Sequence, residues 1–98
     1  MNLTYNQSRR VEKVITDYSR ALGFETAKQY IDTIVGSALA VAEKVSVPQN
    51  DAFSVIIKEL KHYYKTNVAS TNSEEKATEV LSTLQSRLNS ALKKKKSK

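Results

Sequence analysis

Apolar residues recur at steps of three and four along four stretches of the chain, the spacing that gathers side chains on one face of an α-helix. The pattern predicts helices over about residues 5–22, 27–45, 47–65 and 73–92, and the last of these has the near-heptad pattern of a bundle seam. The apolar positions predicted to form the core are Val11, Val14, Ile15, Tyr18, Ala21, Leu22, Tyr30, Ile31, Ile34, Val35, Ala38, Leu39, Val41, Ala42, Val45, Phe53, Ile56, Ile57, Leu60, Tyr63, Tyr64, Ala77, Val80, Leu81, Leu84, Leu88, Ala91 and Leu92.

Polar residues indicate where these helices begin. A Ser or Thr three residues ahead of a Gln or Glu can form a capping box, in which each side chain accepts a hydrogen bond from the other residue's backbone N–H. Gly23 is expected to end the first helix, with Phe24 folding back onto it. Pro48 suits the first turn of the third helix, which Asn67 would end. The candidate capping pairs are Thr4 with Gln7, Thr26 with Gln29, Ser46 with Gln49, and Thr71 with Glu74.

Short connections between helices force sequential neighbours to pack antiparallel. The 98-residue chain contains only two Gly and one Pro, too few turn residues for a protein rich in hairpins. The sequence therefore predicts an all-α, antiparallel up-down-up-down four-helix bundle over residues 1–92. Residues 93–98 form a lysine-rich tail that is expected to be disordered. Small residues of the second helix, among them Gly36, Ser37 and Ala40, would let a neighbouring helix approach closely.

The composition favours a soluble protein of a reducing compartment. The chain has no Cys, and its first ten residues lack the apolar core of a signal peptide. Its longest charge-free stretch in the most apolar region covers residues 33–42, half the length needed to span a bilayer. We therefore expect a cytoplasmic protein.

The net charge of +6 is concentrated at the end of the chain. Lys93, Lys94, Lys95, Lys96 and Lys98 account for five of the 16 basic residues, which leaves eleven against ten acidic residues in 1–92, or +1. Attraction to anionic partners is thus expected to reside in the tail. That tail could improve solubility, contact nucleic acid without specificity, or touch anionic lipid, where each lysine contributes about 1 kcal/mol.

The sequence contains few candidate catalytic or metal-binding residues. His62 is the one histidine, the chain has no Gly-rich phosphate loop, and no second histidine exists to build a metal site in the bundle. We therefore expect neither an enzyme nor a cofactor. Basic and aromatic residues interleave over 58–65, which a solvated face beside a core stripe explains. Val55 lies away from the core arc, as an edge filler or an exposed contact, and Tyr5 lies off the stripe of its own helix.

Residues 41–67, VAEKVSVPQNDAFSVIIKELKHYYKTN, lead from a helix ending in a Glu-Lys pair through Val47-Pro48 into an apolar helix. In this stretch and in overall layout the chain resembles the immunity proteins of pediocin-like (class IIa) bacteriocins. The resemblance implies a cytosolic antiparallel four-helix bundle, not an enzyme, that protects a bacteriocin-producing cell from its own peptide. We expect the bundle to be a monomer. It would act at the inner face of the membrane, where it recognises the mannose phosphotransferase permease engaged by the bacteriocin.

In that family the C-terminal half governs which bacteriocin is countered, which places the contacts here in the last two helices and the tail. Two alternatives stay open: a helical adaptor that binds another protein's helix, and a nucleic-acid-associated protein, which should concentrate basic residues on one helix face. The candidate partner-binding residues are Val55, Lys58, His62, Lys65, Arg87, Lys93, Lys94, Lys95, Lys96 and Lys98.

Overall fold

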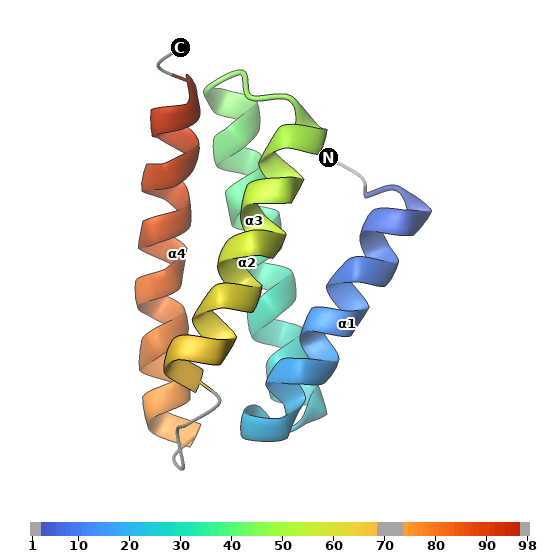
Figure 1. The fold of residues 1–98 in the computed structure, drawn as a ribbon, viewed down its shortest axis with the longest axis vertical. Coiled ribbons are helices and arrows are strands. Elements are labelled where there is room, and N and C mark those ends of the chain that lie inside the picture. Colours follow the sequence, from blue (N-terminus) through green and yellow to red (C-terminus); the bar gives the residue numbers. More distant parts are fainter. Residues whose placement is uncertain (1–2, 69–73, 97–98) are drawn as a thin grey trace.

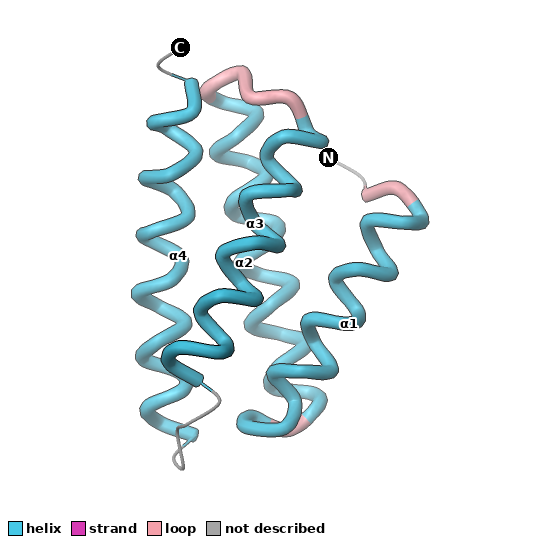
Figure 2. Tube along the Cα trace, in the orientation of Figure 1, coloured by secondary structure: helices cyan, strands magenta, loops and turns pink. Residues whose placement is uncertain are grey.

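The computed structural model describes residues 3–68 and 74–96, without the side chains of residues 74–78, 80, 95 and 96. Over these residues the chain is helical and has no strand (Figures 1 and 2). This confirms the predicted all-α class. The elements are α1 (Tyr5–Leu22), α2 (Phe24–Lys44), α3 (Gln49–Tyr63), the π-helix η1 (Tyr64–Val68) and α4 (Glu74–Lys96).

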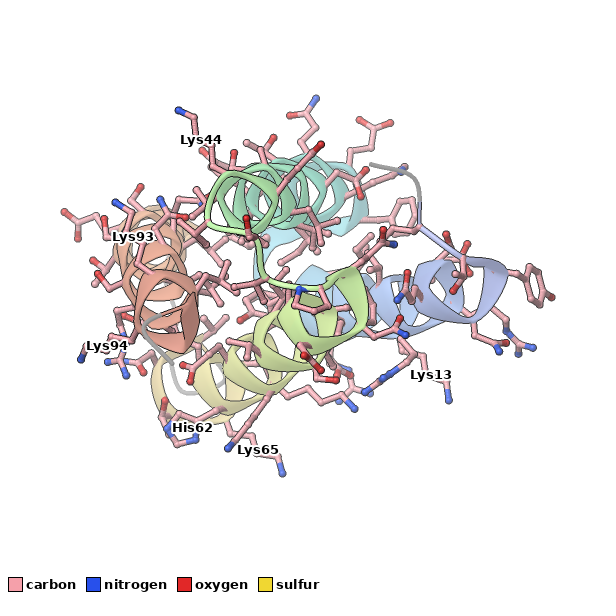
Figure 3. All side chains as sticks on the ribbon, turned by 90° about the horizontal axis from the view of Figure 1, so that it is seen from above. Lys13, Lys44, His62, Lys65, Lys93 and Lys94 are labelled. Carbon is pink, nitrogen blue, oxygen red and sulfur yellow. The ribbon has the colours of Figure 1, made fainter. Side chains whose placement is uncertain are left out.

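Successive α-helices run in opposite directions, so the predicted up-down-up-down bundle is confirmed (Figure 1). α1 packs mainly on α2, and α4 packs on both α2 and α3. Viewed from above, α1 and α4 therefore lie on opposite flanks of the α2–α3 pair (Figure 3). This arrangement leaves α3 and α4 side by side, with their polar faces on one side of the molecule.

Most of the predicted core residues are buried, including Leu81, Leu84 and Leu88 of α4. Ala21, Val41, Val45 and Tyr64 are half-buried at its edge, and the side chains of Ala77 and Val80 lie outside the described residues. The prediction for Tyr30 is wrong, because its side chain is 36% exposed. Successive residues of a helix point about 100° apart. The buried face of α2 extends from Ile31 toward Val35 and Leu39, so Tyr30 falls beyond its opposite edge.

The first capping box is confirmed. The backbone N–H of Thr4 donates to Gln7 Oε1 at 3.1 Å, and that of Gln7 donates to Thr4 Oγ1 at 3.2 Å. Gln7 is buried and also connects α1 with α3: its Nε2 donates to Asn50 Oδ1 at 3.1 Å, and its Oε1 accepts from Gln49 Nε2 at 2.9 Å. One side chain thus caps its own helix and fixes it to another.

The second capping box is wrong, because α2 begins three residues earlier than predicted. Gly23, at φ 82°, ends α1 by donating to the Ser19 carbonyl at 2.9 Å, and its own carbonyl accepts from Ala27 N–H at 3.0 Å to start α2. Phe24 therefore enters the first turn of α2 and is 61% exposed instead of folding back. Of the small residues of this helix, Gly36, Ser37 and Ala40 are exposed and do not serve helix packing, whereas Ala38 and Ala42 are fully buried.

The third capping box is wrong as well, because Ser46 ends α2 instead of starting α3. Its φ of 59° places it in the left-handed region, and its N–H donates to Glu43 O at 3.2 Å. The next N–H, of Val47, donates to Ala42 O at 2.9 Å, which completes a Schellman motif with Val47 as the buried contact. Pro48 becomes the N-cap of α3. The predicted Thr71 and Glu74 pair lies outside the described residues.

The third helix continues into η1, which reaches Val68, one residue past the predicted terminator Asn67. Val68 is fully buried and anchors this π-helical turn to the core. Close to the start of η1, the buried Tyr18 hydroxyl donates to the Leu60 carbonyl at 2.7 Å. The Tyr18 hydroxyl therefore has its partner inside the protein. Its ring lies 5.2 Å from that of Tyr64, tilted by 58°.

α4 continues to Lys96, four residues beyond the predicted end at Leu92. Residues 93–96 are therefore helical, not a disordered tail. Leu92 is fully buried at the last core position, lysine is a good helix former, and positive charge at a helix C-terminus is favoured by the helix dipole. Residues 97 and 98 lie outside the described residues, so their disorder stays a prediction.

Candidate functional site

A groove between the polar faces of α3 and α4 is lined mostly by basic side chains. On the α3 side these residues follow the spacing i, i+3, i+4 and i+7, which places them on one helical face. Leu60 and Tyr63 are buried on the opposite face and so turn this face toward solvent. The groove has a volume of about 420 Å³ and is lined by Lys58, Glu59, Lys61, His62, Lys65 and Arg87.

A second depression of about 370 Å³ continues the groove along α4. It shares Glu59 and Arg87 with the first depression and adds the short side chains of Ser86, Ser90 and Ala91, with Lys94 at its far end. We call the two depressions together the α3–α4 groove. The first depression is lined by long, mostly basic side chains, whereas the second also includes short ones.

The Arg87 side chain packs on the ring of Tyr63. Its guanidinium carbon lies 5.6 Å from the centroid of the buried Tyr63 ring, a cation–π contact between α4 and α3. The neighbouring positions Leu84 and Leu88 are fully buried and fix this part of α4 to the core. Arg87 is exposed, as are Lys58, Lys61 and Lys65, but its guanidinium also packs on the Tyr63 ring.

The groove has a strong local positive charge. Lys58, Lys61, Lys65, Arg87 and Lys94 contribute +5 and Glu59 contributes −1, which gives +4 with His62 neutral. Lys28 and Asp32 form an ion pair at 2.9 Å on α2, outside the groove. Charge averaged over residues 1–92 conceals this concentration. The expectation that attraction to anions resides in the tail alone is therefore incomplete, since such an arrangement can hold a multivalent anionic surface.

The two described groups with shifted pKa values lie outside the groove. A hydrogen bond from Lys28 to Asp32 raises the pKa of the exposed Lys28 amine. Burial, followed by the nearby Tyr63, Tyr64 and Asp17, raises the pKa of the Tyr18 hydroxyl well above its usual range. Neither group offers an acid or a base to the groove.

Four of the predicted partner-binding residues, Lys58, His62, Lys65 and Arg87, lie together in the groove, and Lys94 lines its continuation. Lys93 projects from α4 on the side of α2, where Lys44 lies, whereas His62 and Lys65 project from the other side (Figure 3). Among the remaining candidates, the side chains of Lys95 and Lys96 and all of Lys98 lie outside the described residues. Lys93 and Lys94, the members of the lysine block whose side chains are described, thus lie on two different faces.

The proposal of Val55 as an exposed contact is wrong, and the alternative of an edge filler is right. Val55 is half-buried and packs against the core. It directly precedes the fully buried Ile56 and lies three residues after the fully buried Ala52, so the width of the buried face reaches it. It does not line the α3–α4 groove.

Sequence reasoning left out Lys61, Glu59, Ser86 and Ser90, which also line the groove. Lys61 had a signal in the sequence, because it lies three residues after Lys58 and four before Lys65. No local pattern marks the other three, since only the packing of α4 beside α3 brings Ser86 and Ser90 next to Glu59.

Other features of the described residues are less specific. A depression of about 270 Å³ between α1 and α2 is lined by Glu12, Ile15, Thr16, Phe24 and Lys28. In the parts of the chain that the structure describes, no three His, Cys, Asp or Glu side chains gather as a metal site would need. None of the described helices is both long and apolar enough to cross a bilayer.

Comparison of the chain with family models, with curated proteins and with solved structures found no match.

Proposed function

We propose that this chain is an immunity protein of the pediocin-like type, which protects a cell by binding and not by catalysis. The observation that carries the proposal is the convergence of Lys58, His62, Lys65 and Arg87 in one groove. These residues come from the C-terminal half, where the resemblance places the contacts of an immunity protein. They lie on two helices and up to 29 positions apart in the sequence, since 87 − 58 = 29.

The structure supports such a role by presenting charge on a rigid support. The groove is built on α3 and α4, and both helices are fixed by fully buried residues such as Ile56 and Leu84. A site on packed helices keeps its geometry when a partner binds, so less conformational entropy is lost. In the proposed function this surface meets the bacteriocin-engaged mannose phosphotransferase permease from the cytosol, and the protein acts as a monomer without a cofactor.

The test is protection of a bacteriocin-sensitive bacterium that expresses the chain. The cells are challenged with the pediocin-like peptide encoded beside the gene, and survival is compared with that of cells carrying an empty vector. We expect survival with the intact chain. We expect a large loss of protection with a groove variant, Lys58→Gln, Lys61→Gln and Lys65→Gln combined, which leaves Arg87 on its Tyr63 support.

A matched control removes the same charge elsewhere. Arg9, Lys13 and Arg20 are exposed on α1, so changing all three to Gln lowers the net charge equally without altering the groove. We expect this α1 variant to protect as well as the intact chain, at equal protein levels measured by immunoblot. Equal killing with and without a folded, well-expressed intact chain would reject the immunity function and favour the helical adaptor.

A further inference from the structure

The lysines of the α3–α4 groove are more exposed to solvent than Glu59, the one carboxylate among its described lining. Lys58, Lys61 and Lys65 are exposed, whereas Glu59 is half-buried. Lys94, also exposed, extends the basic edge along α4. A flat anionic surface laid across the edges would meet the lysine ammonium groups first and remain farther from Glu59.

The same geometry disfavours a nucleic acid strand lying within the groove. A phosphodiester backbone there would approach the carboxylate of Glu59. Proteins that bind unpaired strands also stack bases on exposed aromatic rings. The described lining includes the exposed imidazole of His62 but no Phe, Tyr or Trp, and the ring of Tyr63 is buried beneath Arg87.

The groove also lacks apolar side chains that could enter a bilayer. Ala91 is the one apolar residue among its described lining, and the exposed large hydrophobic residues Tyr5, Phe24 and Tyr30 belong to α1 and α2. Contact with a lipid surface would therefore be electrostatic and reversible. Contacts of this kind depend on anionic headgroups and weaken as salt screens them.

We propose that the α3–α4 groove is the face by which the bundle lies on an anionic phospholipid membrane, with α3 and α4 against the headgroups and α1 away from them. This inference deepens the proposed function, because it names the surface on which the protein would wait for its receptor. The membrane contact involves neither bacteriocin nor receptor, so it can fail or succeed independently of protection.

The test measures partitioning of the full chain onto vesicles by sedimentation at low salt. Intact protein should bind mixed phosphatidylglycerol–phosphatidylcholine vesicles, fail to bind pure phosphatidylcholine, and dissociate at about 0.5 M salt. Each cation at an anionic surface contributes about fivefold to partitioning, so the Lys58, Lys61 and Lys65 to Gln variant should bind roughly a hundredfold more weakly. Helicity and the urea midpoint of that variant should match those of the intact chain.

The α1 variant with Arg9, Lys13 and Arg20 changed to Gln is the matched control, because it carries the same net charge. It should retain partitioning to within about fivefold, since its three charges belong to α1, on the opposite flank of the bundle from α4, and none of them lines the groove. Equal losses in the two variants would overturn the proposal in favour of a general charge effect. Loss on deletion of residues 93–98 alone, with the groove variant unaffected, would assign the contact to the tail.

Binding of nucleic acid to the groove is the remaining alternative to test. Intact protein is offered fluorescent single- and double-stranded DNA at the same salt, with and without competing anionic vesicles. We expect the vesicles to displace any bound DNA. DNA binding that survives the vesicles and is lost in the groove variant would overturn the membrane proposal.

Discussion

The Tyr18 hydroxyl joins α1 to the last turn of α3 through a buried hydrogen bond, and its removal is a precise test of the structure. Tyr18→Phe keeps the ring and its packing on Tyr64 but deletes a buried bond of 2.7 Å to the Leu60 carbonyl. That carbonyl still accepts from the Tyr64 N–H, so it is not left without a partner. We therefore expect the ordinary net cost of a hydrogen bond, about 1 kcal/mol, and not the larger cost of an orphaned group.

A loss of about 1 kcal/mol should lower the melting temperature by about 4–8 °C in a domain of this size. Urea titrations followed by far-ultraviolet circular dichroism would show this loss as a lower unfolding midpoint at unchanged slope. Tyr63→Phe is the matched control, because Tyr63 is also a packed ring but has no described hydrogen bond from its hydroxyl. Its effect should stay within about 0.5 kcal/mol. Equal midpoints for Tyr18→Phe and the intact chain would refute the bond.

The same substitution should alter stability at high pH. A tyrosine in the unfolded chain releases its proton near pH 10, about its ordinary pKa, whereas burial keeps Tyr18 protonated in the folded state. Above about pH 10 the unfolded state therefore binds fewer protons than the folded state, and stability declines as pH rises. Tyr18→Phe removes this contribution, so its stability should fall less steeply above about pH 10 than that of the intact chain. Parallel declines would contradict the buried, neutral phenol.

Three further substitutions test the packing. Leu84→Ala removes a fully buried side chain of α4 and should cost about 2–5 kcal/mol in urea unfolding; an unchanged midpoint would reject its place in the core. Ser46→Gly should raise thermal stability by about 0.5–1 kcal/mol, because glycine tolerates the φ of 59° at the end of α2; a loss would contradict the left-handed cap. Val55→Asp should destabilise by more than about 1 kcal/mol, because Val55 packs on the core. If Val55→Asp changed the free energy of unfolding no more than the exposed substitution Lys58→Gln, the packing of Val55 on the core would be contradicted.

Local patterns were sufficient for the number, order and approximate limits of the helices. The spacing of apolar residues depends only on helical geometry, so α1 was predicted over the residues it occupies and the Leu81, Leu84 and Leu88 seam was identified. Capping was predicted less well, because one sequence pattern can serve two ends. Ser46 has the residue type of an N-cap, but the chain uses its left-handed conformation to finish α2.

The candidate site was predicted in part for a similar reason. Lys58, His62 and Lys65 share a face through spacing alone, so the sequence was enough to group them. Their proximity to Arg87 depends on how α4 lies beside α3, and no local pattern encodes that relation. The separation of Lys93 from Lys94 also required the orientation of α4, because adjacent residues of a helix point about 100° apart.

The sequence by itself determined the helical class, the heptad-like seam and the total charge, since each follows from residue type and from spacing within a single helix. Only the tertiary structure decided which charges share a surface, that Val55 packs inward, and that the Tyr18 hydroxyl meets a carbonyl 42 residues away. The physical reason is that these properties arise from the packing of one helix on another. That packing is set by the shapes of buried side chains from all four helices at once, and a pattern within one helix does not contain it.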